Sequence, residues 1–478
     1  MAAEDHKVVI AGVPVATEVW DEVRSPWDGS LVGRVPRCGP DEVEAACAGA
    51  AAALARGDLP AWRRAEVLDA AAVLLAERTE EVARLVAAEA GKPLRDARGE
   101  VARCLDTLRY SAVEARTLSG DLLPLEGSRS AAGRLGFSKR VPLGVVAAIT
   151  PFNFPLNLVA HKVGPAIAAG CPVVLKPAEQ APLSALALVG LLVEAGLPAD
   201  WISVVTGDGP GAGVPLVAHP VPAMVSFTGS VPAGKAIAAA APDKKVALEL
   251  GSTSPVIVEP DADVAFVVER IRQGGFSYAG QSCISTQRVL VHESVRDELT
   301  SALVEAVGSL VVGDPLDEAT EVGPLISAEE TERVRTWLAE AADAGARVLV
   351  GGGEGPGGAI TPAVVVDVPP DASLQRREVF GPVVTVTGYA DLDEAIALAN
   401  DSDFGLHCGL FTRDLDTVLA AFEALDFGGV IVNDVPTFRA DQQPYGGTKD
   451  SGITREGPAY TVREMTALRT AVIRGVGT

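Results

Sequence analysis

The sequence predicts an α/β protein built from two doubly wound domains, in which helices cover mostly parallel sheets. The chain has 478 residues, more than a single hydrophobic core normally supports, so two or three domains are expected. Short apolar runs rich in Val and Ile, each bounded by Gly or Pro, have the character of buried strands. They alternate with helix-period segments, and this alternation is typical of a doubly wound parallel sheet.

After an irregular start, we predict helices at about 41–56, 61–90 and 101–115, the second of them stopped by Gly91 and Pro93. A domain boundary is expected near Gly251. Before it we predict strands at 144–150, 171–177, 201–207, 223–229 and 245–251, with helices at 156–170 and 183–197. After it we predict strands at 254–260, 289–293, 383–389 and 429–434, with helices at 296–310 and 327–345. The Gly-rich stretch 351–358 is expected to be a surface turn.

The composition favours a small-molecule partner. A net charge of −23 repels phosphate backbones and anionic lipids, so nucleic acids and membrane surfaces are poor candidates. The first 20 residues lack a basic stretch followed by an apolar one, so we expect a cytoplasmic protein. Six cysteines without a C-x-x-C pair and five histidines without metal-ligand spacing predict neither a disulfide framework nor a protein-bound metal.

Two residues have the chemistry expected of an active site. Cys283 ends the polar, Gly-rich segment Gly280-Gln-Ser-Cys283, whereas the other five cysteines lie in helical or strand-like surroundings. It is either a structural thiol or a nucleophile. Glu249 is a carboxylate in an otherwise apolar strand, where an unpaired charge is costly. It is either half of an ion pair or a general base.

Seven short segments carry a resemblance to a known family. They are 151–155 (PFNFP), 176–179 (KPAE), 227–230 (FTGS), 248–251 (LELG), 280–283 (GQSC), 378–382 (EVFGP) and 444–447 (PYGG). In this order and at these spacings the chain resembles the aldehyde dehydrogenase superfamily over almost its whole length. Ser252, where the family commonly has a second glycine, resembles a branch that acts on small oxygenated aldehydes, including lactaldehyde-like, glyceraldehyde-phosphate-like and phosphono-aldehyde enzymes.

The resemblance implies a catalytic role for three residues. Cys283 would attack the aldehyde carbon and form a thiohemiacetal, then a thioester intermediate. Asn153 and the backbone N–H of Cys283 would hold the oxyanion. Glu249 would activate the water that hydrolyses the thioester. Two alternatives are a CoA-acylating enzyme and a non-catalytic protein of the same fold. The first would generally lack the glutamate that corresponds to Glu249, and the second would need neither this glutamate nor the cysteine that corresponds to Cys283.

The resemblance also implies NAD as the cofactor, with NADP possible. Lys176 and Glu179 would bind the adenine ribose, where the carboxylate of Glu179 would repel the 2′-phosphate of NADP. Gly229 and Ser230 would bind the pyrophosphate at a helix N-terminus. The remaining residues expected at the cofactor are Ile149, Thr150, Pro151, Phe152, Gly209, Phe227, Leu250, Glu378 and Phe380.

Substrate preference is predicted from the positions that line the family's substrate tunnel. They hold Arg103, His161, Ser282 and Arg439 here. Guanidinium groups bind phosphonate, phosphate and carboxylate oxygens, so an anionic aldehyde such as phosphonoacetaldehyde or phosphonoformaldehyde is the first expectation. Lactaldehyde and glyceraldehyde 3-phosphate remain alternatives. If both arginines turn to solvent or pair with neighbouring carboxylates, a lactaldehyde-like substrate is favoured instead.

The resemblance divides the chain into three parts. Residues 1–119 and 143–250 would form the NAD-binding domain, and 251–445 the catalytic domain. Residues 120–142 and 453–475 would form a strand pair for oligomerisation, so a homodimer or homotetramer is expected.

Overall fold

The computed structural model describes residues 4–475, so residues 1–3 of the predicted first domain lie outside the described residues. A parallel sheet of five strands in the order β10-β9-β8-β11-β12 lies at the centre of the first lobe. Its strands are β8 (Val145–Ile149), β9 (Val173–Lys176), β10 (Ile202–Val204), β11 (Pro222–Thr228) and β12 (Lys245–Glu249). The strand order reverses between β8 and β11, and ligands bind at such a reversal.

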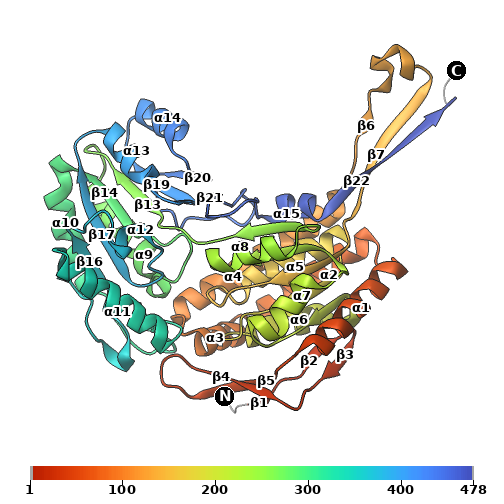
Figure 1. Ribbon diagram of the computed structural model, residues 1–478, viewed down its shortest axis with the longest axis horizontal. Coiled ribbons are helices and arrows are strands. Elements are labelled where there is room, and N and C mark those ends of the chain that lie inside the picture. The colour runs from red at the N-terminus through yellow and green to blue at the C-terminus, as the bar shows by residue number, and fades with distance from the viewer. Residues whose placement is uncertain (1–3, 476–478) are drawn as a thin grey trace.

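Helices cover this sheet (Figure 1). They are α1 (Pro40–Arg56), α2 (Ala61–Glu77), α3 (Thr79–Ala90), α4 (Leu94–Thr117), α5 (Asn157–Ala169), α6 (Leu183–Glu194), α7 (Val214–Ala218) and α8 (Val231–Ala240). Every residue of α5 is buried, because this helix lies between the sheet and its helical neighbours. Its polar side chains therefore have to find partners inside the protein.

Two predictions for the N-terminal part were wrong. The single helix at 61–90 is two helices separated at Arg78, where the Thr79 hydroxyl donates to the carbonyl of Ala76 at 3.0 Å and competes with the helical bonds. The start is not irregular but forms short strands, too short for a clear period of two. They are β1 (Glu4–Asp5), β2 (Val8–Ile10), β3 (Val13–Val15), β4 (Trp20–Arg24) and β5 (Leu31–Pro36).

The second lobe contains a seven-stranded sheet in the order β15-β16-β17-β14-β13-β19-β20, parallel except for β15. Its strands are β13 (Pro255–Val258), β14 (Arg288–His292), β15 (Arg347–Val350), β16 (Ala363–Val366), β17 (Val383–Tyr389), β19 (His407–Phe411) and β20 (Gly429–Val432). Its helices are α9 (Val264–Phe276), α10 (Glu293–Gly308), α11 (Ala328–Asp343), α12 (Ser373–Arg376), α13 (Leu392–Asn400) and α14 (Leu415–Ala424). The α/β prediction with two wound sheets is confirmed.

An arm of three strands projects from the body of the molecule (Figure 1). β22 (Thr466–Arg474) pairs antiparallel with β7 (Arg134–Pro142), which also pairs with β6 (Leu122–Leu123). The predicted strand element 453–475 is only partly extended, because 458–464 form helix α15 (Pro458–Glu464) on α4 and α5. Leu135, Phe137 and Ile473 are exposed on one face of the arm. Such an apolar face suits pairing with another subunit, and the oligomer stays a prediction.

Two further elements complete the chain. β18 (Phe404–Gly405) pairs antiparallel with β21 (Thr448–Lys449) and ties the segment after β20 back to the second lobe. Within residues 4–475, none of the helices has both the length and the apolar character that a bilayer-spanning helix requires.

Candidate active site

The carboxyl ends of the strands in the first sheet face a cavity of about 570 Å³. It lies where the strand order reverses, between the segments that follow β8, β9 and β11. Ten of the residues predicted to bind the cofactor line it: Ile149, Thr150, Pro151, Phe152, Lys176, Glu179, Gly209, Phe227, Gly229 and Ser230.

The lining of this cavity fits a dinucleotide. The buried hydroxyls of Thr150 and Thr228 have no hydrogen-bond partner within residues 4–475, so each can bind a ligand atom. Ser230 precedes α8 without capping it through its side chain, which leaves N–H groups of the first turn available to a pyrophosphate. Glu179 is exposed close to the buried Lys176, so an acceptor and a donor are both present for ribose hydroxyls.

The other three predicted cofactor residues lie at the junction with the second sheet. Leu250 directly follows β12. Phe380 makes an edge-to-face contact with Phe152, with the ring centroids 5.9 Å apart. Glu378 accepts the backbone N–H of Ser252 at 3.0 Å, and burial raises the pKa of its carboxyl to about 7. Residues from both lobes therefore meet at the inner end of the cofactor cavity.

Cys283 lies at the end of a second cavity, of about 720 Å³, between the two lobes. It follows the short 3-10 helix η5 (Ser277–Gly280) and precedes β14. Its thiol is partly buried, and burial raises the pKa of this thiol to about 12. Its Sγ is 2.7 Å from the hydroxyl of Tyr445. Ser282, Glu249 and Arg439 line the same cavity.

Two N–H donors lie at the loop that carries Cys283. Asn153 is buried in the segment after β8, and its Nδ2 donates to the carbonyl of Gln281 at 3.0 Å. This bond holds the amide beside the cysteine loop and uses one of the two N–H groups on Nδ2. The backbone N–H of Cys283 makes no hydrogen bond in the part of the chain that the structure describes. One N–H of the Asn153 amide and the backbone N–H of Cys283 therefore remain available to donate to an oxyanion.

Glu249 ends β12 and lines the Cys283 cavity. Its Oε1 accepts the hydroxyl of Thr454 at 3.2 Å, while its buried Oε2 has no partner within residues 4–475. Burial, reinforced by the nearby charge of Glu456, raises the pKa of Glu249 well above its usual value. A carboxylate with a free oxygen and a raised pKa is suited to accept a proton from water.

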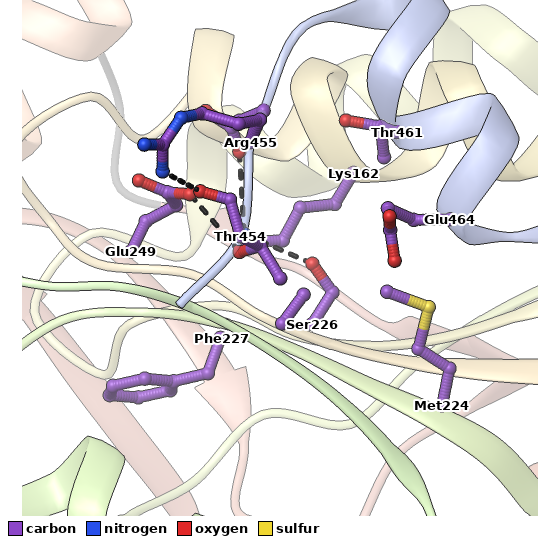
Figure 2. A pocket seen from close by; sticks show the side chains of 11 residues that line it. Lys162, Met224, Ser226, Phe227, Glu249, Thr454, Arg455, Thr461 and Glu464 are labelled. Atoms are coloured by element: carbon purple, nitrogen blue, oxygen red, sulfur yellow. Dashed lines mark hydrogen bonds and ion pairs between the residues drawn. The ribbon is translucent and has the colours of Figure 1, made fainter. Parts of the chain in front are cut away.

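Figure 2 shows a small cavity on the other side of Glu249, with a volume of about 10 Å³. Lys162, on the buried helix α5, donates to Ser226 at 3.2 Å, and its Nζ is 3.5 Å from Glu456 Oε1. Burial lowers the pKa of the Lys162 ammonium. A space of this size holds about one water molecule. Glu249 thus lines both the Cys283 cavity and this smaller one.

Of the three basic residues predicted to bind the substrate, Arg103 and Arg439 line the Cys283 cavity, whereas His161 is fully buried and does not, and all three have carboxylate partners. Arg103 on α4 donates through Nη2 and Nε to Asp441, at 2.8 and 3.4 Å. His161 on α5 contacts the same carboxylate at 2.9 Å, and burial together with the charge of Arg439 lowers the pKa of its ring. Arg439 donates through Nη2 to Glu456 at 2.8 Å, but its buried Nε has no partner within residues 4–475. Pairing of both arginines with carboxylates would favour a lactaldehyde-like substrate. Arg103 is paired in this way, whereas Arg439 is paired only in part.

Four residues at the site were not given a role from the sequence: Tyr445, Asp441, Glu456 and Lys162. Tyr445 stood inside a quoted motif, and Lys162 was a charge in an otherwise apolar helix, which is a signal for a buried ion pair. Nothing in the sequence indicates that Asp441 meets Arg103, because 338 residues separate them.

The sequence pattern of the aldehyde dehydrogenase family matches residues 16–471. The chain therefore belongs to this family. It is 46% identical over 433 residues to a 3-sulfolactaldehyde dehydrogenase of Priestia aryabhattai, covering 91% of this chain and 90% of that protein. It is 39% identical to a lactaldehyde dehydrogenase of Methanococcus maripaludis strain C5, covering 87% of this chain and 88% of that one.

Solved structures show the same fold. Aldehyde dehydrogenase 21 of Physcomitrella patens, in complex with the reaction product succinate, superposes with a TM-score of 0.97 at 40% identity over 100% of both chains. A glyceraldehyde-3-phosphate dehydrogenase of Methanocaldococcus jannaschii, complexed with NADP, gives 0.91 at 38% identity over 95% of this chain and 99% of that one. The predicted family is confirmed.

Family membership makes the chain an NAD(P)-dependent oxidoreductase that acts on an aldehyde. The nicotinamide, when bound, accepts the hydride that leaves the aldehyde carbon. The cavity at the reversal between β8 and β11 is the site that fits this cofactor.

Glu179 is expected to make the enzyme prefer NAD to NADP. Its carboxylate lies exposed on the cofactor cavity, where it would repel a 2′-phosphate. In Glu179→Ser, the kcat/KM with NAD divided by the kcat/KM with NADP should fall by about tenfold. This corresponds to the loss of roughly 1.4 kcal/mol of repulsion. Glu18→Ser, which removes an exposed carboxylate outside this cavity, should leave the ratio unchanged. Steady-state kinetics with both cofactors check this, and a native enzyme with the lower KM for NADP would show the assignment of Glu179 to be wrong.

Proposed function

We propose that the protein oxidises a three-carbon 2-hydroxyaldehyde to the corresponding acid with NAD(P), and that the third carbon of its preferred substrate carries an anionic group. The observation that carries the proposal is Arg439, a charged residue that lines the Cys283 cavity and whose buried Nε has no partner in residues 4–475. An unpaired buried guanidinium nitrogen is costly unless a ligand pairs with it.

The reaction would proceed on the residues around Cys283. Its thiolate attacks the aldehyde carbon, and the resulting oxyanion accepts hydrogen bonds from Asn153 Nδ2 and from the N–H of Cys283. Loss of hydride to the cofactor leaves a thioester on the sulfur. Glu249 then takes a proton from a water molecule, whose oxygen attacks the thioester and releases the acid.

The charges beside Arg439 support an anionic substituent. Arg439 and Lys162 share one carboxylate, Glu456, at 2.8 and 3.5 Å. Burial acts to raise the pKa of Glu456. Attraction by Lys162, His161 and Arg439 outweighs burial and lowers this pKa to about 2, so the carboxylate stays ionised. Glu456 is thus the direct carboxylate partner of both cations, and the Nε of Arg439 is left without a partner that a substrate anion could supply.

The names of the similar proteins support the three-carbon frame. Lactaldehyde, 3-sulfolactaldehyde and glyceraldehyde 3-phosphate all contain 2-hydroxypropanal, and the last two carry an anion on the third carbon. The Physcomitrella patens structure contains succinate, a dianion whose four-carbon chain is similar in length to these three-carbon aldehydes. None of these names contains a phosphonate, so phosphonoacetaldehyde and phosphonoformaldehyde become secondary members of a substrate panel.

Neutral lactaldehyde is the second candidate. The observation that favours it is the pairing of Arg103 with Asp441, because this ion pair removes one of the cations expected to hold a substrate anion.

Arg439→Leu distinguishes the two candidates. Loss of a charge-assisted bond to a desolvated anion costs roughly 2–4 kcal/mol, so kcat/KM for 3-sulfolactaldehyde should fall about 30- to 1000-fold. The value for lactaldehyde should change much less. Arg103→Leu, which removes a cation already held by Asp441, should alter the ratio of the two substrates less than Arg439→Leu does. Equal losses on both substrates in Arg439→Leu would favour neutral lactaldehyde.

A further inference from the structure

Tyr445 is held rigidly beside the sulfur of Cys283. Its backbone N–H donates to the carbonyl of Glu456 at 2.9 Å, and the N–H of Glu456 returns a bond to Tyr445. The guanidinium of Arg439 lies over the ring, 3.8 Å from its centroid, and the ring of His407 meets it edge-on at 5.1 Å. The side chain is 2% exposed. With the ring fixed on these sides, the hydroxyl has one position.

The hydroxyl of Tyr445 contacts the sulfur of Cys283. The hydroxyl oxygen of Tyr445 is 2.7 Å from Cys283 Sγ, and within residues 4–475 no other side chain hydrogen-bonds either atom. His407 keeps its own orientation through a 3.0 Å contact between Nδ1 and the carbonyl of Pro436, so it does not compete for the hydroxyl. Tyr445 therefore touches the atom that would form the bond to the substrate.

The direction of this hydrogen bond depends on the state of the sulfur. With a thiol, either group can donate. With a thiolate, only the hydroxyl can donate, and a bond to an ionised acceptor is roughly twice as strong as a neutral one. The contact thus stabilises the thiolate more than the thiol, and it opposes the effect of burial, which raises the pKa of Cys283.

We infer that Tyr445 is a further catalytic residue, whose hydroxyl donates a hydrogen bond to the Cys283 thiolate and aims the sulfur at the aldehyde. The inference rests on the proposed role of Cys283 as nucleophile. The thiol proton leaves to water in the cavity, and Tyr445 keeps its own proton throughout, so it acts as a donor and not as the base.

Tyr445→Phe tests the inference, because it removes one oxygen and leaves the ring under Arg439. In the full-length protein without cofactor, the alkylation rate of Cys283 by iodoacetamide is measured against pH. The midpoint of the profile should rise by about one pH unit, which lowers the thiolate fraction near neutrality about tenfold. kcat/KM should fall by a similar factor and recover at high pH.

Two controls and a second test make the result specific. Cys283→Ala measures the background from the other five cysteines, which are all buried. Tyr110→Phe, at an exposed tyrosine on α4, should leave the midpoint unchanged. Incorporation of 3-fluorotyrosine at position 445, with its more acidic hydroxyl, should move the midpoint downward and provides the test if the phenylalanine variant does not fold.

An unchanged midpoint in Tyr445→Phe, together with an inactive Cys283→Ala, would overturn the inference and leave the proposed function intact. A lower kcat without a shift of the midpoint would also overturn it, because packing alone would explain that result. An active Cys283→Ala would instead overturn the assignment of the nucleophile.

Discussion

Cys283→Ala is expected to lower aldehyde oxidation by about three orders of magnitude or more, because no other nucleophile can form the covalent intermediate. The other five cysteines are buried and none of them lines the Cys283 cavity, so none is placed to replace it. Production of NADH, followed by absorbance with 3-sulfolactaldehyde or lactaldehyde as substrate, measures the loss.

Cofactor binding should survive this substitution. The cofactor cavity is lined by residues that follow β8, β9 and β11, and Cys283 is not among them. Titration of the variant with NAD, followed by fluorescence or calorimetry, should therefore give a Kd close to that of the native protein. Turnover above a few per cent of the native rate would show that Cys283 is not the nucleophile.

Glu249→Gln is expected to stop turnover after one cycle while leaving hydride transfer intact. The first half of the reaction needs the sulfur and the oxyanion donors, whereas hydrolysis needs a base for the attacking water. Rapid mixing with aldehyde and NAD should therefore give a burst of one NADH per active site, followed by a steady rate lowered by about two orders of magnitude or more. Absence of the burst would mean that Glu249 activates Cys283 instead.

The pH dependence of hydrolysis provides a second readout of Glu249. Because burial raises the pKa of its carboxyl, the base form is lost as pH falls through that raised value. Where hydrolysis limits turnover, the native rate should rise with pH, and Glu249→Gln should lack this rise. Glu464→Gln is the matched control, since Glu464 lines the small cavity behind Glu249 but pairs with Lys245 near the surface.

The sequence predicted the strands that carry the site better than the rest of the fold. The runs that became β8, β9, β11 and β12 are apolar and bounded by Gly or Pro, because strands buried on both faces need continuous hydrophobic residues. β16 and β19 were not assigned although they are equally buried, and the first five strands are short. The break between α2 and α3 depends on the hydroxyl of Thr79 and has no Gly or Pro to mark it.

The residues that line the two cavities were predicted through their motifs, but their partners were not. Tyr445 lies 162 residues from Cys283 in sequence, and Asp441 lies 338 from Arg103. Contacts at such separations are set by how the lobes pack, which no local pattern encodes. This is why Arg103 and Arg439 were predicted first of all to hold a substrate anion, whereas the structure gives each of them a carboxylate partner.

The central claim, that oxidation passes through a thioester on Cys283, is tested most directly by the mass of the trapped intermediate. Glu249→Gln is mixed with NAD and lactaldehyde, quenched in acid, digested and analysed by mass spectrometry. The account predicts a lactoyl group on the peptide that contains Cys283, which hydroxylamine removes as expected of a thioester. Formation of NADH without any adduct, or with the acyl group on a different residue, would contradict it.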